Sequence, residues 1–388
     1  MFLSGLLRSA LQAELDRFFA KYTGSRLPVR RVTASAVSHA RAKLSYEAFV
    51  ELMHEVARYV YENAPWQRWH GLRLLAIDGS TARLPDRASV RNHFGDQPSG
   101  PVTGPPLARV SVLRDVMNNL FVDAIIAPYR LGETDLVGGH LKFLRRGDLV
   151  LLDRGYTGVA LYRKILARGA EICVRLGLKS SRWTLAFIES GLGEQIVQME
   201  PTDEARAELR RCGLPTGPVT LRLIRVELST GQVEVLATSL LDGQRWPSEL
   251  LAALYCKRWS VEEMIKRSKS RMELENFSGL SVLAVLQDFY AHAFTANLTA
   301  ALALPIHRVI PQVYANRKVT YQINWTQALA KMKDWMVSLF SGKRLRELIR
   351  RLQERFVENV SLVRPGRSYP RRQKVARRSY PVAYKPIS

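Results

Sequence analysis

Cysteine is scarce in this chain of 388 residues, which contains only Cys173, Cys212 and Cys256. These cysteines are scattered, and no C-x-x-C pair occurs. The sequence therefore predicts neither a disulfide framework nor a zinc knuckle, and its cysteine usage is typical of a protein of the reducing cytoplasm.

Uninterrupted apolar runs are also missing. The N-terminal stretch MFLSGLLRSALQAELDRFF is broken by Arg8, Gln12 and Glu14, so it lacks the apolar centre of a signal peptide. The most apolar stretch, residues 282–305, contains an acid, a histidine and two amide side chains, and predicts a buried helix rather than a membrane span. Those side chains are Gln287, Asp288, His292 and Asn297. We expect a soluble, intracellular protein.

Acidic residues are few relative to basic ones. The chain has 58 Lys and Arg against 35 Asp and Glu, a net charge of +23, and a pI near 10.3. Such an excess predicts an extended polyanionic partner, with nucleic acid favoured over an anionic membrane surface. A generic basic protein kept soluble by its charge is the alternative, but part of the excess is clustered at the C-terminus.

The C-terminal segment, residues 364–388, has eight basic residues, four prolines and no acidic residue. This composition predicts a tail that is disordered alone and becomes ordered on DNA phosphates. A solvated tail without a specific role is the alternative. Its DNA-contact candidates are Arg371, Arg372, Arg377 and Arg378.

One stretch combines basic residues with a carboxylate. Residues 255–269 read YCKRWSVEEMIKRSK. On a helix, at about 100° per residue, four side chains share a face roughly 60° wide: Tyr255, Arg258, Glu262 and Lys269. An acid that can hold a metal then lies beside cations that can hold phosphate oxygens, which predicts a phosphate-handling site.

Two alternatives remain for this stretch. It fits a solvated basic helix with ordinary Glu–Lys pairs four residues apart. Ser260 can also cap a helix, with Glu263 in the reciprocal position of a capping box. The helix would then begin at Ser260, and Tyr255 and Arg258 would precede it.

Two aspartates upstream are each predicted to end a strand. LRLLAIDGST reaches Asp78 before Gly79, and GDLVLLDRGYTG reaches Asp153 before Gly155. A carboxylate in this position is held rigidly by the sheet, and the turn leaves room for a metal and a phosphate. The alternative for each is an ordinary turn aspartate that bonds its own backbone. With Glu262, they form a set of three acids.

These motifs resemble those of cut-and-paste DDE transposases of the insertion-sequence family four type. The signature around the third acid of that family is Y-x2-R-x3-E-x6-K, and this chain matches it with Tyr255, Arg258, Glu262 and Lys269. DGS at 78–80 resembles the first-acid motif, and DRGY at 153–156 resembles the second. The resemblance covers most of the chain, in motif order.

The resemblance implies that Asp78, Asp153 and Glu262 are the catalytic residues and the ligands of two Mg²⁺ or Mn²⁺ ions. Asp78 would bridge the ions, and the other two acids would each hold one. Hard oxygen ligands suit these ions. A metal pair can activate the attacking oxygen and stabilise the leaving one, which is the chemistry that DNA cleavage and strand transfer require.

The resemblance also implies double-stranded DNA as the partner, both as transposon ends and as target, bound by a homodimer on paired ends. Tyr255, Arg258 and Lys269 would position phosphates near the cut. At the N-terminus, two predicted helices with Thr33 and Ser45 as caps could form a helix-turn-helix. Its DNA-contact candidates are Ser38, His39, Arg41 and Lys43. A small helical cap on the next domain is the alternative.

The order of predicted elements indicates an α/β fold. From 71 to 176, three strands, a helix, a strand, a helix and a strand match the first part of an RNase H-like core with mixed pairing. Residues 177–246 read as a mostly β insertion, and 247–305 as the second part of the core with the catalytic helix. The flanks are helical: 1–70 is a DNA-binding region, and 306–388 ends in the basic tail.

The insertion contains three strand-like runs, TLAFIESG, PVTLRLIRVELS and QVEVLATSLLD, and the segment EPTDEARAELRRCG, which reads as a loop or a helix. In some relatives an insertion tryptophan stacks on a flipped base at the transposon end. Trp183 and Trp246 are the candidates here, and packing is the alternative for each.

Two other functions remain open from the sequence. The chain could be a domesticated DNA-binding regulator that retains the acids without using them. It could also be an RNase H-like nuclease that cleaves DNA without strand transfer.

Overall fold

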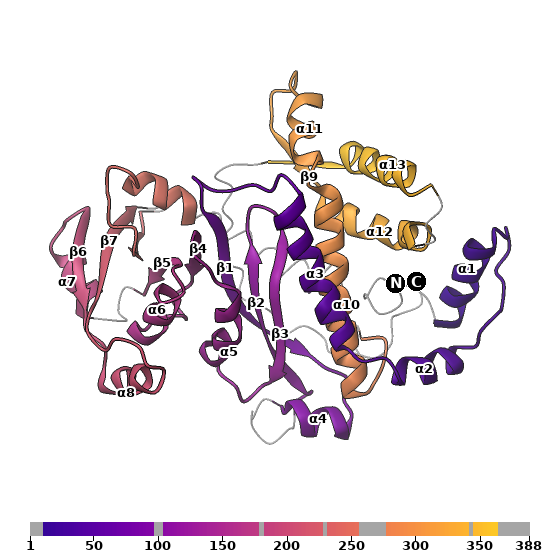
Figure 1. Cartoon of the computed structure of the whole chain (residues 1–388), viewed down its shortest axis with the longest axis horizontal. Helices are drawn as coiled ribbons and strands as arrows, with labels where there is room; N and C mark the ends of the chain where they lie inside the picture. The colour runs from indigo at the N-terminus through magenta and orange to yellow at the C-terminus, as the bar shows by residue number, and fades with distance from the viewer. Residues whose placement is uncertain are drawn as a thin grey trace. The chain divides into compact units, whose positions relative to one another are not determined.

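The computed structural model describes residues 11–96, 104–177, 182–227, 231–255, 277–340 and 344–363. The chain divides into two compact units. The first comprises 1–66, 82–108 and 266–388, and the second comprises 67–81 and 109–265. The first unit is built mainly of helices and the second around a sheet (Figure 1).

The sheet has eight strands in the order β3-β2-β1-β4-β5-β8-β7-β6. β4 is parallel to both β1 and β5, whereas β8, β7 and β6 add on in antiparallel pairs. The strands are β1 (Arg73–Arg83), β2 (Leu107–Asp115), β3 (Leu120–Pro128), β4 (Asp148–Leu152), β5 (Glu171–Leu176), β6 (Glu194–Met199), β7 (Val219–Glu227) and β8 (Val233–Thr238).

The first five strands have the order of an RNase H-like core, 3-2-1-4-5. Only residues 116–119 join β2 to β3, and so short a link between sheet neighbours requires an antiparallel hairpin. Asp115 supports this turn by accepting the amides of Met117 and Asn118, each at 3.0 Å. Asn119 takes the left-handed conformation, with φ 56°. The predicted α/β, RNase H-like fold with mixed strand pairing is therefore confirmed.

A buried ion pair stabilises the register of β1 against β4. Arg73 and Asp148 are paired residues of the two strands, and the guanidinium donates to both carboxylate oxygens, at 2.8 and 2.7 Å. A shifted register would separate these two buried charges. Removal of one partner from a buried ion pair typically lowers the free energy of unfolding by about 3–5 kcal/mol. The pair therefore determines which residues face one another at the other ends of these strands.

The insertion extends the same sheet, because β8 pairs with β5. Two of its predicted strands form β7 and β8, and EPTDEARAELRRCG contains the helix α8 (Asp203–Arg211). The strand predicted for TLAFIESG is wrong, since these residues lie largely in the helix α7 (Arg182–Glu189). Thr184 and Phe187 are its buried side chains, and their spacing of three is helical.

Both helices predicted within the core are present: α5 (Glu133–His140), followed by the short η1 (Leu141–Phe143), and α6 (Val159–Leu166). The last residue of α5 is anchored to the sheet, because the buried His140 ring bonds the Ser111 hydroxyl at 3.0 Å and Asp123 at 2.7 Å. Such a trio also occurs in hydrolases. Here Ser111 is fully buried, so the contact is structural.

Helix α10 is the long buried helix of the first unit, as predicted for 282–305. It lies alongside α3 (Figure 1), and Asn297 donates to the Met53 carbonyl at 2.9 Å. The elements of this unit are α1 (Leu11–Thr23), α2 (Ala34–Ala42), α3 (Glu47–Asn63), α4 (Ala88–Phe94), α10 (Val282–Ala303), α11 (Ile306–Val313), β9 (Tyr321–Ile323), α12 (Trp325–Phe340), α13 (Leu345–Glu358) and β10 (Val360–Leu362).

Among the described helices, none alone meets the length and hydropathy of a membrane span, although α10 and α11 together, bent by 51°, do so. The two predicted helix caps differ in outcome. Thr33 accepts the Ala36 amide at 3.2 Å and caps α2 as predicted. The cap predicted at Ser45 is wrong by one residue, because Tyr46 is the N-cap of α3, although Ser45 accepts the Glu47 amide at 3.2 Å.

Candidate active site

Asp78 lies inside β1, so the prediction that it ends a strand is wrong. The strand continues through Gly79 to Arg83. What ends near Asp78 is the pairing with β4, whose last partner on β1 is Ala76. Because β1 is longer than β4 and has β2 as its other neighbour, the chain stays extended after its pairing with β4 has ended.

Asp153 directly follows β4, as predicted. Ala76 of β1 pairs with Leu151 of β4 in a parallel register. Two residues further along each chain lie Asp78 and Asp153, so the two aspartates occupy equivalent positions at one end of neighbouring strands. Neighbouring strands lie about 4.8 Å apart. The register thus brings together two of the three predicted acids, and their catalytic role stays a prediction.

Arg175 of β5 is a neighbour of Asp153 that the sequence reasoning missed. Leu152 pairs with Val174, which places the next residues, Asp153 and Arg175, beside each other. The Arg175 Nη2 lies 2.8 Å from Asp153 Oδ1, and its Nη1 lies 2.7 Å from Glu234 of β8. The guanidinium thereby joins the second acid to a strand of the insertion. Only the strand register reveals this contact, and no local motif signals it.

Tyr255 is the described part of the Y-x2-R-x3-E-x6-K signature. It is the last described residue before 277 and lies in a helical segment that includes 248–255, and its side chain is buried. Its hydroxyl donates to the Leu152 carbonyl at 3.2 Å, so the signature begins beside the residue that precedes Asp153. This contact gives Tyr255 a packing role. Arg258, Glu262 and Lys269 lie outside the described residues.

Residues 69–298 of the chain match the family model described as Transposase DDE domain. This range is more than half of the chain and contains all three predicted acids. The chain belongs to the DDE transposase family. The resemblance inferred from the motifs is confirmed, and with it an enzyme that depends on divalent metal and acts on DNA.

Individual relatives agree with this assignment. The chain is 25% identical over 361 residues to "Transposase InsG for insertion sequence element IS4" of Escherichia coli (strain K12), which covers 91% of this chain and 79% of that protein. It is also 29% identical over 145 residues to "Putative transposase InsZ" of the same organism. That alignment covers 35% of this chain and 47% of InsZ.

A solved structure also aligns with this DDE transposase: the cryo-EM structure of the piggyBac transposase synaptic complex with hairpin DNA. The alignment has a TM-score of 0.43 and 13% sequence identity, and it covers 95% of this chain and 76% of that chain. Because the TM-score and the sequence identity are both low, the fold assignment rests on the strand order of the sheet and not on this alignment.

The residues predicted to bind metal are described only in part, since Glu262 lies outside the described residues. Among the described residues, no group of three His, Cys, Asp or Glu side chains could hold a metal ion. Asp78 and Asp153 supply oxygen ligands of the kind that Mg²⁺ and Mn²⁺ prefer. The site therefore fits a divalent metal, with Glu262 as the expected third ligand.

The DNA contacts predicted outside the active site have different outcomes. The Arg41 guanidinium donates to Gln287, Ser278, the Ala284 carbonyl and Asp288 at 2.6–2.8 Å. These four bonds give Arg41 a structural role, so its predicted DNA contact is unsupported. Ser38, His39 and Lys43 are exposed, as a DNA contact requires. The tail residues Arg371, Arg372, Arg377 and Arg378 lie outside the described residues.

The two tryptophans considered for base stacking differ in their surroundings. Trp246 is buried and stacks on Trp69, with ring centroids 5.3 Å apart, so the packing interpretation holds for it. Trp183 is only partly buried and lines a cavity of about 1110 Å³.

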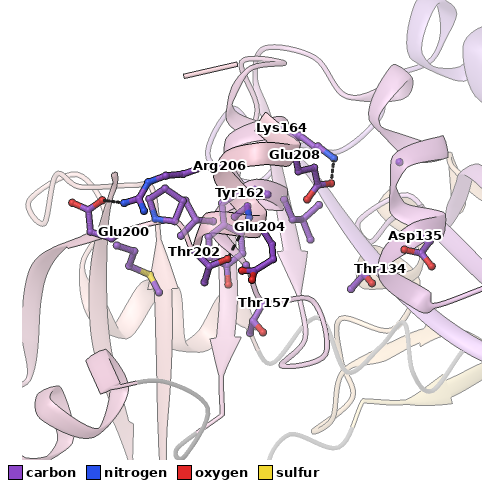
Figure 2. Close-up of a pocket in the computed structure, with 18 of the residues that line it drawn as sticks. Thr134, Asp135, Thr157, Tyr162, Lys164, Glu200, Thr202, Glu204, Arg206 and Glu208 are labelled. Atoms are coloured by element: carbon purple, nitrogen blue, oxygen red, sulfur yellow. Dashed lines mark hydrogen bonds and ion pairs between the residues drawn. The ribbon is translucent and has the colours of Figure 1, made fainter. Parts of the chain in front are cut away.

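The cavity beside Trp183 is lined mainly by α5, α6 and α8 (Figure 2). Its two basic lining residues are already paired: Lys164 with Glu208, and Arg206 with Glu200. Two further acids line it. Because acids outnumber cations, this cavity is a poor site for a DNA phosphate.

Proposed function

We propose that this DDE transposase carries out cut-and-paste transposition of a bacterial insertion sequence, by cleaving transposon ends and joining them to target DNA. The observation that supports this most is the register that aligns Asp78 with Asp153 on neighbouring strands. Two adjacent carboxylates repel each other, and nearby cations relieve that repulsion. Arg175 is one such cation, beside Asp153, and bound metal ions would be others.

Asp78 would bridge two Mg²⁺ or Mn²⁺ ions, and Asp153 and Glu262 would each hold one. Bound ions activate the attacking oxygen and stabilise the leaving oxygen at the phosphate. Arg175 orients the Asp153 carboxylate from the side of β5, at 2.8 Å. Arg258 and Lys269 hold phosphate oxygens, as their charge allows.

The basic excess supports binding along DNA outside the active site. Lys43 with its exposed neighbours, and the tail arginines, contact phosphates without reading sequence. A homodimer on paired ends and a cytoplasmic location complete the proposal.

A supercoiled plasmid that carries candidate terminal inverted repeats tests this function in the presence of Mg²⁺. Excision followed by joining to a target plasmid supports it. Cleavage without joining would identify a nuclease, and binding without cleavage would identify a regulator. The Asp78→Asn variant is the control for contaminating nucleases, since it must be inactive in the same assay.

A further inference from the structure

Gly79, the residue after Asp78, is tightly enclosed by two polar side chains. A Cβ added at this position would lie 2.7 Å from the Glu133 carboxyl carbon, 2.8 Å from its Oε2 and 2.8 Å from the Tyr156 hydroxyl oxygen. Real Cβ atoms do not approach heavy atoms so closely. Because side chains alternate along a strand, this space lies on the opposite face of β1 from the Asp78 side chain.

The Glu133 carboxylate is itself oriented. Its Oε1 lies 3.4 Å from Nη1 of Arg109 on β2, and the Arg109 guanidinium lies 4.5 Å from the ring centre of Tyr129. One carboxylate oxygen thus faces Arg109, and the other faces Gly79. Glu133 begins α5, so the contact joins β2, α5 and β1.

Tyr156 connects the same point to the second acid. It is buried and lies three residues after Asp153, in the DRGY motif. Gly79 is therefore where the strand of the first acid meets the loop of the second. A side chain that supports this junction influences the spacing between the two carboxylates.

We propose that Glu133 is a positioning residue, which supports the backbone at Gly79 and so holds Asp78 and Asp153 at the spacing that a metal pair requires. This inference rests on the proposed function. Residues that orient metal ligands affect metal affinity about 10- to 100-fold when they are replaced. Glu133 is 39% exposed, so its replacement leaves the fold intact.

The test compares Glu133→Ala with Asp135→Asn in the full-length protein. Asp135 is in the same helical turn, and its carboxylate accepts the Gly132 amide at 2.9 Å, away from Gly79. Asp135→Asn therefore removes one negative charge from the same helical turn, keeps an oxygen that can accept the Gly132 amide, and leaves the contact at Gly79 unchanged. Two quantities are measured: Mn²⁺ affinity by electron paramagnetic resonance, and the Mn²⁺ concentration at half-maximal cleavage of saturating DNA.

We expect Glu133→Ala to lower the Mn²⁺ affinity about tenfold and to raise the half-maximal Mn²⁺ concentration about tenfold. Asp135→Asn should change neither quantity. Gly79→Ala should have at least the effect of Glu133→Ala, because the new methyl group meets the Tyr156 hydroxyl as well as the Glu133 carboxylate. Equal metal affinity in Glu133→Ala and wild type would overturn the inference, as would equal losses in Glu133→Ala and Asp135→Asn. A wild type that binds Mn²⁺ at the acids but never cleaves would instead overturn the proposed function.

Discussion

Two buried Arg–Asp ion pairs, one in each unit, are similar in chemistry but stabilise different parts of the fold. Arg73 and Asp148 belong to neighbouring strands, and their side chains are 5% and 1% exposed. Arg41 and Asp288 belong to α2 and α10, and their side chains are 14% and 7% exposed. Both pairs join segments that are distant in the sequence.

The two pairs differ in what they align. The contact between Arg73 and Asp148 is bidentate and stabilises a strand register, and that register determines that Asp78 faces Asp153. Arg41 divides its bonds among four groups and joins helices that carry none of the predicted acids. We therefore expect loss of the first pair to impair both stability and metal binding, and loss of the second to impair stability alone.

The largest effect is expected at the acids themselves. Asp78→Asn, Asp153→Asn and Glu262→Gln keep the shape of each side chain but remove the charge that holds metal. Cleavage should fall at least about a thousandfold, since metal-ion stabilisation is worth several kcal/mol. End binding, measured by gel shift, should remain close to that of wild type.

Glu263→Gln is the matched control for Glu262→Gln. On a helix its side chain points about 100° away from that of Glu262, so its loss should reduce cleavage little. If the two variants lose activity equally, the assignment of the third acid from the helical face is incorrect.

The comparison of the two ion pairs is tested by Asp148→Ala and Asp288→Ala. Each leaves a buried arginine without its acid and should lower the free energy of unfolding by about 3–5 kcal/mol, as measured by urea denaturation. Only Asp148→Ala should also weaken Mn²⁺ binding, because only that variant releases the β1–β4 register. Weakened Mn²⁺ binding in both variants would remove the distinction.

Ionisation of Asp288 adds a pH dependence to the first unit. Burial raises the pKa of Asp288 from 3.8 to about 6, although Arg41 opposes the shift. The native state thus holds this proton more tightly than the unfolded chain does. The resulting stability is fully present below the unfolded value and is lost as the pH rises through the folded one.

Relative to Asp288→Asn, wild type should therefore lose on the order of 3 kcal/mol of unfolding free energy as the pH rises through this window. Urea denaturation of both proteins from about pH 4 to about pH 7 measures the difference. A difference that does not change with pH would show that Arg41 offsets the cost of burial completely.

The smallest effect is expected for the tail. Deletion of residues 364–388 removes eight positive charges, so affinity should weaken for end-containing and random duplexes alike. The dependence of log affinity on log salt should become shallower, while the metal requirement of cleavage stays the same. An unchanged salt slope would mean that the tail does not contact phosphates.

Local patterns in the sequence predicted the core elements well, because β1 and β4 contain short buried apolar runs, at 74–77 and 149–152. They failed where distant residues decide the outcome. Asp78 lies within a strand because β1 continues beyond the last residue that pairs with β4. Arg41 is a structural residue because its partner Asp288 lies far along the chain. α7 was mistaken for a strand because a short apolar run fits both periods.

The site itself was predicted as a set of residue types, and its geometry was not. The three acids follow from motifs, but the contacts of Arg175 with Asp153 and of Glu133 with Gly79 arise from strand register and loop packing. Neither has a local sequence signal.

The central claim is that Asp78, Asp153 and Glu262 hold one metal pair. Crystals of the full-length protein grown with Mn²⁺ test it directly, because anomalous scattering locates the ions independently of the protein density. We predict two peaks, with Asp78 in contact with both and with Asp153 and Glu262 each in contact with one. Ions bound elsewhere, or Glu262 remote from the two aspartates at an occupied site, would contradict the account.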